Sequence, residues 1–530
     1  MSGKFMVPRS GAAGRAPVTV RRLPVRHIPT FSRCDVPMTT AFPAGDAPLL
    51  PLDAPLARTP GAPSLQRQLL RRVRDAILGG AMPAGTRLPG TRALAETLGV
   101  SRNTTAAVYE QLVAEGFLQI GSSRHAGRRA VAAHAAAPAV PRRRPSRSGS
   151  AGIRPSLVGT GESEGFRPGV PALSHFPVDA WRHAIDRALR RAGRELLAYG
   201  DPLGEPALRE SIARHLAVTR GVRCDPEQIV ITEGAQGAIA LCAQLLTNPG
   251  DTVWVEEPGY RGARTAMQAA DLDVVPMPVD AEGLRAEPDD WRERTPRLVY
   301  TTPSNQFPTG AVLSISRRLA LIDAARRHRA WIIEDDYDSE FRHTGEPIGA
   351  MHGLAPDSPV VYLGSFSKTM FPALRIGFLV LPDALLAAVR PALPEMLRGG
   401  TRHVQLALAD FIETGEYGRH LGRMRRLYRD RRRLLLAALE RSLSVPHQVE
   451  GGPCGLHLAL RLPARYRDRA IVEAARAHGI GPFPLSGFAI DAARAGNGLV
   501  LGFGNTSADA FEPMLRMVSA IAERVGAGDA

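Results

Sequence analysis

The sequence predicts two folded units, a small helical one followed by a large one of the α/β class. The chain has 530 residues, whereas a single hydrophobic core rarely serves more than about 250–300. Between residues 63 and 129, apolar residues recur at helical spacing. Beyond residue 159, short β-rich runs alternate with helix-length segments, which is typical of a sheet covered by helices on both faces.

The composition narrows the class of partner. A formal charge of +15 favours polyanions, although it does not separate nucleic acid from an anionic membrane surface. No run of about twenty apolar residues occurs, so we expect no membrane-spanning helix. The four cysteines lie far apart and form no CxxC pair, so we expect a reducing cytoplasm and no metal site.

Residues 1–63 are rich in arginine and proline and show no helical period. Prolines at positions 8, 17, 24 and 29 would interrupt an amphipathic helix. We therefore expect a disordered tail, or a start placed too early, with Met38 as the true start.

Three helices are predicted in the N-terminal unit. The first lies within residues 64–79, where four apolar residues recur four apart: Leu65, Leu69, Val73 and Ile77. A second covers 91–98 and ends at Gly99, and Ser101 is a suitable N-cap for a third. Two helices joined by a short glycine-containing turn are the geometry that lays the second helix into the major groove of DNA.

The start of that third helix carries the predicted DNA-binding residues. Its first positions would meet base edges and phosphates, and an arginine at the start of the preceding helix would reach the same groove. The candidates are Arg92, Ser101, Arg102, Asn103 and Thr104. The alternative is that they are ordinary exposed residues at helix ends.

A family resemblance supports this assignment. Residues 85–104 (GTRLPGTRALAETLGVSRNT), 108–112 (VYEQL) and 115–118 (EGFL) resemble the GntR-type winged helix-turn-helix. The resemblance implies a domain over 64–130 that binds double-stranded operator DNA. The chain departs from the family at Gly90, where serine is usual, and in the wing, where Gly121-Ser-Ser-Arg124 replaces a Gly-Ser-Gly turn.

Residues 131–160 are dominated by alanine, proline and arginine, with few large apolar side chains to bury. This composition predicts a flexible linker. Its arginines, at 142, 143, 144 and 147, either contact DNA phosphates or form a solvated charge run.

Six apolar runs predict the strands of the large unit, which we expect over 161–530: 228–232, 252–256, 298–302, 330–335, 360–364 and 376–380. Ligands of α/β sheets bind at the carboxyl ends of the strands. Chemically distinctive residues follow several of these runs.

Together these residues satisfy the needs of a pyridoxal 5'-phosphate (PLP) site, namely a lysine, an acid, a stacking ring and phosphate donors. Lys368 follows one strand, flanked by Ser365 and Arg375 as phosphate donors. Asp335 would pair with the pyridinium and Tyr337 with the 3'-oxygen. Three further candidates are Tyr260 as the stacking ring, and Ala235 and Gln236 as backbone donors at a helix start.

The large unit resembles the fold-type I aminotransferases from Phe166 to Arg524, and with a GntR-type head the whole chain resembles the MocR subfamily of regulators. This resemblance implies Lys368 as the aldimine lysine, with the acid, ring and phosphate roles as given above. It also implies a head-to-tail homodimer in which Tyr199 reaches the partner's phosphate.

Two departures from the aminotransferases bear on function. Phe307 occupies the position of an asparagine that commonly holds the cofactor's ring oxygen, so Asn305 or Gln306 would have to substitute. Val500 stands where many have an arginine that binds an amino acid's carboxylate. We therefore expect the effector to be PLP itself or an amine without a carboxylate.

The sequence favours a PLP-dependent transcription regulator that senses PLP or an amine through an aldimine on Lys368. In this hypothesis the aminotransferase-like domain is a sensor, with residual transaminase activity left open. One alternative is an active aminotransferase carrying an accessory DNA-binding head. Another is a DNA-binding protein whose C-terminal unit is a cofactor-free relic.

Overall fold

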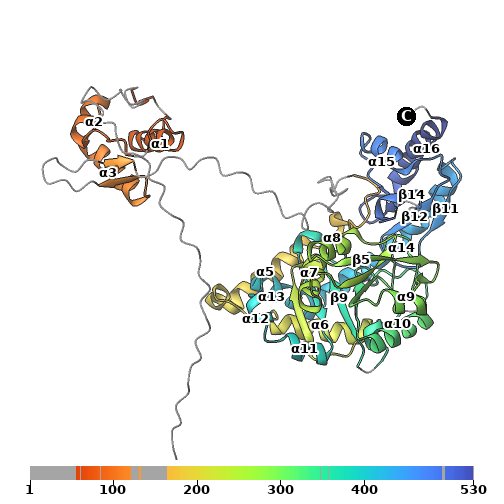
Figure 1. Cartoon of the computed structure of the whole chain (residues 1–530). Coiled ribbons are helices and arrows are strands. Elements are labelled where there is room, and N and C mark those ends of the chain that lie inside the picture. The colour runs from red at the N-terminus through yellow and green to blue at the C-terminus, as the bar shows by residue number, and fades with distance from the viewer. Residues whose placement is uncertain are drawn as a thin grey trace, which may run out of the picture. The chain divides into compact units, whose positions relative to one another are not determined.

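The computed structural model describes residues 55–59, 61–83, 85–120, 130–132, 164–345, 348–355, 357–491, 494 and 496–528. The chain divides into two compact units, Met1–Arg143 and Arg144–Ala530 (Figure 1). We call the first the head and the second the C-terminal unit. Residues 1–54, most of the predicted linker and the wing turn at 121–124 lie outside the described residues.

The head contains three helices and a short antiparallel hairpin. The helices are α1 (Leu65–Leu78), α2 (Thr91–Leu98) and α3 (Arg102–Ala114), and the strands are β1 (Leu118–Ile120) and β2 (Ala130–Ala132). This order is that of a winged helix-turn-helix. β2 extends to Ala132, two residues past the predicted end of the domain at 130.

The turn between α2 and α3 has clear local causes. Gly99 ends α2 in the left-handed conformation, with φ of 61°. The Ser101 hydroxyl accepts a hydrogen bond from the Thr104 N–H at 3.1 Å, as predicted for an N-cap. Buried Thr105 donates its hydroxyl proton to the Thr91 carbonyl at 2.8 Å, which joins the two helices.

Within residues 1–63, which we expected to be a disordered tail or a start placed too early, residues 55–59 contact the head. Leu56 is buried in the head's core, and the backbone of Ala57 exchanges two 2.9 Å hydrogen bonds with the Gln68 side chain. The Arg58 guanidinium donates to the Gly99 carbonyl. The buried Leu56 side chain and these hydrogen bonds together hold residues 55–59 against the head.

Gly90 caps α2 without a side-chain hydrogen bond, at φ of −62° and ψ of 155°. Any residue adopts this conformation, and a Cβ there would meet nothing within 4 Å. Gly90→Ser should therefore stabilise α2 by about 0.4 kcal/mol, which slows amide exchange of α2 roughly twofold. Gly99→Ser is the matched control and should speed that exchange, because its φ is positive. Slower exchange in both variants would contradict the capping argument.

The C-terminal unit is built on an eight-stranded mixed sheet in the order β3-β10-β9-β8-β7-β4-β5-β6. The strands are β3 (Ile229–Thr232), β4 (Thr252–Glu257), β5 (Asp273–Asp280), β6 (Gly283–Leu284), β7 (Leu298–Thr301), β8 (Trp331–Asp336), β9 (Val360–Ser365) and β10 (Gly377–Val380). The strands β4, β5, β7, β8 and β9 are parallel to one another. Because β10 is antiparallel to both β9 and β3, β3 runs in the same direction as the parallel set.

Helices cover both faces of this sheet, as the sequence predicted (Figure 1). One face packs against α7 (Gly234–Leu246), α8 (Arg261–Ala269) and α11 (Asp383–Val389). The other packs against α6 (Pro206–Thr219), α9 (Pro288–Glu293), α10 (Ile315–His328) and α13 (Arg402–Glu413). The remaining helices of the sheet layer are α5 (Val178–Ala192) and α12 (Leu393–Met396), with short 3₁₀ helices at Leu173–His175, Gly193–Leu197, Pro226–Gln228, Met351–Gly353 and Pro372–Leu374.

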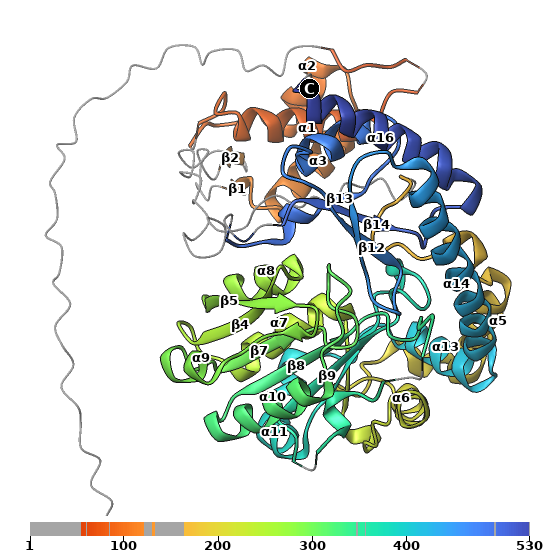
Figure 2. The same ribbon diagram turned by 90° about the vertical axis from the view of Figure 1, so that its right-hand side faces the viewer.

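A second, antiparallel sheet has the order β11-β12-β14-β13 and was not predicted. Its strands are β11 (Gln448–Glu450), β12 (His457–Arg461), β13 (Phe483–Pro484) and β14 (Gly498–Gly502). The helices α14 (Glu416–Ser442), α15 (Asp468–Arg476) and α16 (Phe511–Ala527) lie beside it, with 3₁₀ helices at Leu485–Phe488 and Ala508–Ala510 (Figure 2).

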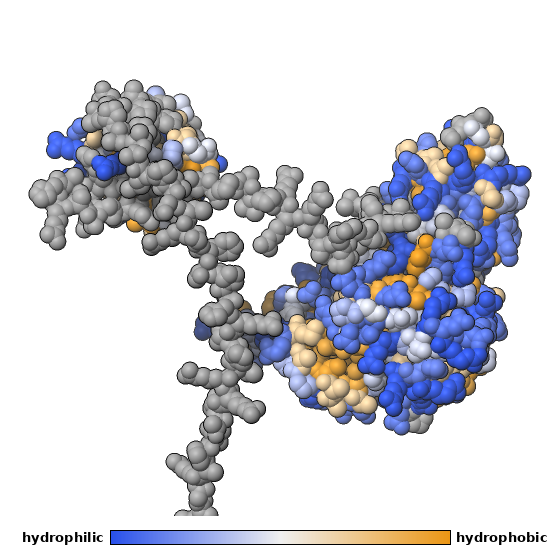
Figure 3. All heavy atoms as spheres, in the orientation of Figure 1, coloured by the Kyte–Doolittle hydropathy of each residue, from blue (hydrophilic) through white to orange (hydrophobic). Residues whose placement is uncertain are grey.

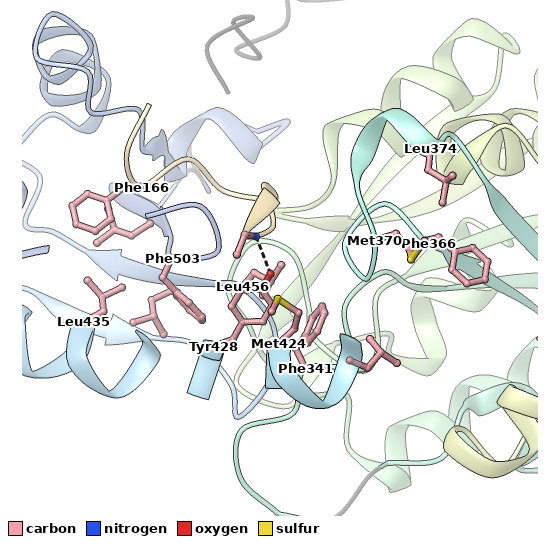
Figure 4. Close-up of a cluster of buried hydrophobic side chains, with 14 of the residues drawn as sticks. Phe166, Phe341, Phe366, Met370, Leu374, Met424, Tyr428, Leu435, Leu456 and Phe503 are labelled. Carbon is pink, nitrogen blue, oxygen red and sulfur yellow. Dashed lines mark hydrogen bonds between the residues drawn. The ribbon is translucent and has the colours of Figure 1, made fainter. Parts of the chain in front are cut away.

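One continuous core joins this sheet to α14 and to the eight-stranded sheet. Figure 4 shows Phe503, Leu456, Tyr428 and Phe341 from different elements packed in one cluster. The buried Tyr428 hydroxyl accepts a 2.9 Å hydrogen bond from the Ala172 N–H (Figure 4). The segment that precedes α5 is thereby fixed over α14.

The surface is mainly hydrophilic on the face seen in Figure 3, with two apolar patches on the C-terminal unit. Within the described residues, no helix is long and apolar enough to cross a bilayer.

Candidate functional site

The predicted DNA-binding residues gather at the start of α3. Arg102 and Asn103 are exposed, and Arg102 has no ion pair among the described residues. Ser101 and Thr104 bond to each other as the helix cap, with their hydroxyl oxygens 2.8 Å apart. Arg92, on α2, is highly exposed and pairs with Glu96 at 3.1 Å, an interaction that contributes little in solvent.

The predicted cofactor residues of the C-terminal unit lie where several strands end or begin. Register places Ser365 beside Gly377, and Gly377 beside Thr232, so the end of β9, the start of β10 and the end of β3 are neighbours. Because β4, β7 and β8 end at this same edge, the loops that follow them meet there.

Lys368 follows β9 by three residues and points inward. Its Nζ donates a 2.7 Å hydrogen bond to the Gly169 carbonyl. Burial lowers the pKa of this amine, while the carboxylates of Asp338 and Asp335 oppose the shift. Burial therefore favours the uncharged amine, which is the nucleophilic form.

Lys368 is also the only lysine in the chain beyond Lys4, among 67 lysines and arginines. Arginine cannot lose its proton in a protein and cannot take the place of a nucleophilic amine. The single lysine of the C-terminal unit thus lies where the chemistry needs one. Residue counting would have revealed this signal from the sequence.

Asp335 is buried near the end of β8 and is only half satisfied. The Tyr300 hydroxyl donates to its Oδ2 at 2.6 Å, whereas its Oδ1 is buried without a hydrogen-bond partner. Burial raises the pKa of Asp335 to about 7, and the hydrogen bond from Tyr300 acts in the opposite direction. A buried carboxylate oxygen without a donor is costly, so the site suits a ligand that brings a cationic N–H.

Asn305 and Tyr337 form a second polar group. The Tyr337 hydroxyl donates to the Asn305 carbonyl at 2.9 Å and lies 3.0 Å from the Asn305 amide nitrogen. That nitrogen also donates to both carboxylate oxygens of Asp338, each at 3.0 Å. Of the two substitutes that the sequence left open, Asn305 is therefore the one beside Tyr337, because Gln306 is turned toward Glu256 and the Pro258 carbonyl.

The start of α7 and Arg375 form an anion cradle. Arg375 donates from Nη2 to the Glu233 carbonyl at 2.7 Å, and its Nη1 lies only 3.2 Å from where a Cβ on Gly234 would be. Ala235 and Gln236 occupy the first turn of α7, whose backbone N–H groups are free for an anion. Ser365 lies on the neighbouring strand, with its hydroxyl 3.0 Å from that of Ser367.

The two predicted tyrosines Tyr260 and Tyr199 differ in where they lie. Tyr260 is largely buried beside Phe307, with ring centroids 6.1 Å apart, and burial raises its pKa to about 12. Tyr199 is 85% exposed, and no hydrogen bond or ring contact joins it to the other site residues among the described ones. A single chain therefore brings together the predicted cofactor residues of the C-terminal unit, with the exception of Tyr199.

Val500 is fully buried in a small apolar cluster with Leu485, Phe488, Phe307 and Phe483. An apolar wall thus replaces the arginine that many aminotransferases have there. The side chains of this wall offer a carboxylate no donor, although the Arg167 guanidinium lies over the Phe483 ring, 5.9 Å from its centroid.

Sequence reasoning missed three site residues. Tyr300 was hidden within an apolar strand, although β7 pairs with β8 directly beside Asp335. Asp338 is buried, and burial raises its pKa to about 8. His457 lies on β12, bonds through Nε2 to the Pro308 carbonyl at 3.1 Å, and has a pKa lowered to about 4 by burial. Asp338 and His457 could not be placed from the sequence, because Asp338 lies in the loop after β8 and His457 lies on the second sheet.

These groups fit PLP: a buried amine, a carboxylate with an unsatisfied oxygen, a hydroxyl–amide pair and an arginine at a helix start.

Comparisons with known proteins match a different family to each of the two units. Residues 65–124 match the family of bacterial regulatory proteins, gntR family, and residues 169–463 match aminotransferase class I and II. The chain is 38% identical over 435 residues to the probable rhizopine catabolism regulatory protein MocR of Rhizobium meliloti, covering 80% of this chain and 86% of that protein.

A further relative and a solved structure extend the agreement. The pyridoxine biosynthesis transcriptional regulator PdxR of Corynebacterium glutamicum is 32% identical over 475 residues, which cover 88% of this chain and 98% of that protein. The α-aminoadipate aminotransferase LysN of Thermus thermophilus, in complex with a phosphopyridoxyl-leucine adduct, superposes with a TM-score of 0.65 at 26% identity. It covers 72% of this chain and 97% of its own.

Asp335→Asn should stabilise the cofactor-free chain by about 1 kcal/mol above pH 7. The raised pKa of Asp335 means that folding disfavours its ionised form. That cost is absent below the pKa of about 4 that aspartate has in an unfolded chain and is complete above about 7, so the gain should shrink as the pH falls from 7 to 4. Urea unfolding at pH 5 and pH 8 measures it.

The same variant should bind PLP roughly 30-fold more weakly, because an amide cannot pair with the pyridinium. A purely structural role predicts the opposite pair of results: lower stability and unchanged PLP binding. Absorbance titration of the folded variant distinguishes the two.

Proposed function

The chain belongs to the MocR subfamily of GntR-type transcription regulators, and from this premise we propose that ligand binding at Lys368 changes the affinity of the head for its operator. The protein is a DNA-binding transcription regulator whose aminotransferase-like unit takes PLP as cofactor.

The observation that carries the proposal is a buried lysine amine and a half-satisfied buried carboxylate at the same edge of the sheet. When bound, PLP supplies an aldehyde that reacts reversibly with primary amines and a pyridine ring that gains from protonation. Lys368 would hold the aldehyde end and Asp335 the ring nitrogen. Asn305 and Tyr337 would hold the ring oxygen, Tyr260 would stack on the ring, and Ser365, Arg375 and the start of α7 would hold the phosphate.

The effector is PLP itself or an amine without a carboxylate. Support comes from the apolar wall around Val500, whose side chains offer an anionic group no donor, and from the Arg167 guanidinium over Phe483, which already pairs with Glu164 at 3.3 Å. The same wall disfavours the alternative of an active aminotransferase for common amino acids, since their carboxylate would be left unpaired. For regulation, the effector must bind one arrangement of the protein more tightly than another.

We further propose a cytoplasmic head-to-tail homodimer. Tyr199 and Leu197 are 85% and 87% exposed, side by side in the chain, which suits residues that a second copy covers. In such a dimer Tyr199 would contribute to the phosphate site of the partner. This contribution would explain why Tyr199 stands apart from the site of its own chain.

Arg102→Ala should weaken operator binding by about 1–3 kcal/mol while PLP binding stays normal. Arg71→Ala, an exposed arginine on α1, is the matched control and should bind like the wild type. Gel shift at physiological salt measures both. Equal affinities of the two variants would remove α3 as the recognition helix.

Lys368→Ala should abolish the absorbance band of covalently bound PLP and make DNA affinity independent of PLP concentration. Because only Lys4 and Lys368 can be trapped, borohydride reduction followed by peptide mass spectrometry should label the peptide that contains Lys368. DNA affinity that still responds to PLP in the variant would exclude covalent sensing.

A further inference from the structure

The longest helix of the C-terminal unit, α14, concentrates positive charge. It carries nine arginines and three acids, whereas residues 164–528 as a whole carry 44 basic and 43 acidic residues. The rest of the unit is therefore net acidic. Charge is segregated onto this helix instead of being spread over the surface.

Several of these arginines lie on the outward side of the helix, whereas Arg431 is buried. Arg419, Arg423, Arg426 and Arg433 are exposed and follow one another at intervals of four, three and seven residues, which places them on one face. The opposite face is buried in the core through Leu421, Met424, Tyr428 and Leu435, among others. Figure 2 shows α14 along an outer edge of the unit.

Most of these side chains have no ionic partner. Arg419 pairs with Glu416 at 2.7 Å, but Arg423, Arg426, Arg429 and Arg433 form no ion pair with any described residue. Asp430 lies on the same face and pairs with none of them.

Other exposed arginines of this unit do pair with acids one turn away. Arg182 pairs with Asp179, Arg292 with Asp289, and Arg516 with Glu512. Local neutralisation is thus common elsewhere in the unit and absent along this stretch of α14.

We propose that this arginine face, defined by Arg423, Arg426, Arg429 and Arg433, binds the phosphate backbone of duplex DNA. The inference rests on the DNA-binding function proposed above and adds a second contact, supplied by the C-terminal unit. The planar guanidinium group binds phosphate oxygens through two parallel hydrogen bonds. Ten residues of helix span about 15 Å, the length of four to five base pairs.

The surroundings favour nucleic acid over other anionic partners. The exposed neighbours include Gly418, and none of the exposed side chains from 418 to 433 is aromatic or large and apolar, as the centre of a protein interface would need. A membrane-surface helix would bury its apolar face in lipid, but the apolar face of α14 is already in the core.

The test compares two variants of the full chain that lose the same charge. The first is Arg423→Gln/Arg426→Gln/Arg433→Gln, and the control is Arg182→Gln/Arg292→Gln/Arg516→Gln. Fluorescence anisotropy measures binding of each to a 40-base-pair duplex of mixed sequence over a salt series. The first variant should lower the slope of log affinity against log salt by about 2–3 and weaken binding about tenfold at low salt. The control should keep the wild-type slope.

A charge-preserving variant, Arg423→Lys/Arg426→Lys/Arg433→Lys, should keep most of the slope. Equal slopes for the two glutamine variants would overturn the proposal and leave a solvated face. If the first glutamine variant lost regulation but kept the wild-type slope of log affinity against log salt, the proposal would also be overturned. The arginine face would then bind an acidic protein partner instead of DNA. Failure of the wild type to bind DNA at all would instead contradict the proposed regulator function. Arg102→Ala, in which the arginine face is intact, separates the contact made by the head from the contact made by α14.

Discussion

The C-terminal unit is organised around a buried carboxylate that the protein does not fully satisfy. Asp335 receives one hydrogen bond, from Tyr300, and its second oxygen receives none. Two further acids, Asp336 and Glu256, lie close enough to raise its pKa. This local excess of negative charge is unfavourable until a cation enters, so the fold carries a cost that a protonated ring nitrogen would remove.

The adjacent residue on the same strand, Asp336, differs in having a cation beside it, although its Oδ1 is likewise buried without a hydrogen-bond partner. Asp336 points to the opposite face of the sheet, where Arg220 lies 2.6 Å away and the Tyr362 hydroxyl donates to it at 2.7 Å. Successive residues of a strand face opposite sides, so a run of acids at the end of β8 serves two purposes. Asp336 ties the sheet to its covering elements through Arg220, whereas Asp335 forms no ion pair within the described part of the chain.

Much of this arrangement could be predicted because it follows from local patterns. The six predicted strands correspond to β3, β4, β7, β8, β9 and β10, each with its ends within one or two residues. The strand β5 was missed because Pro276 and Pro278 interrupt its apolar pattern, which is tolerated because β6 pairs only with Val279 and Asp280 and leaves the rest of that side of β5 unpaired. The choice between Asn305 and Gln306 depended on how the loop turns after β7, and neither spacing nor composition determines that.

The remaining gaps have a different cause, since they depend on contacts between distant segments. Residues 55–59 are ordered by Leu56 and by Gln68, which lies eleven residues beyond Ala57. His457 reaches the site from the second sheet, whose short strands carry little periodicity. Tyr199 stays outside the site of its own chain, and a single sequence gives no way to place a partner's residue.

The apolar wall at Val500 gives the strongest argument for sensing over turnover. An enzyme gains from binding the changing charges of a reaction more tightly than its substrate, and a carboxylate clamp fixes the substrate for that purpose. A sensor needs only that occupancy favours one arrangement, and a tenfold change in DNA affinity requires about 1.4 kcal/mol of coupling. The site keeps the lysine and the carboxylate partner, and Phe483, Phe488 and Val500 stand where the clamp would be, so the proposed sensing function asks less of this site than turnover of amino acids would.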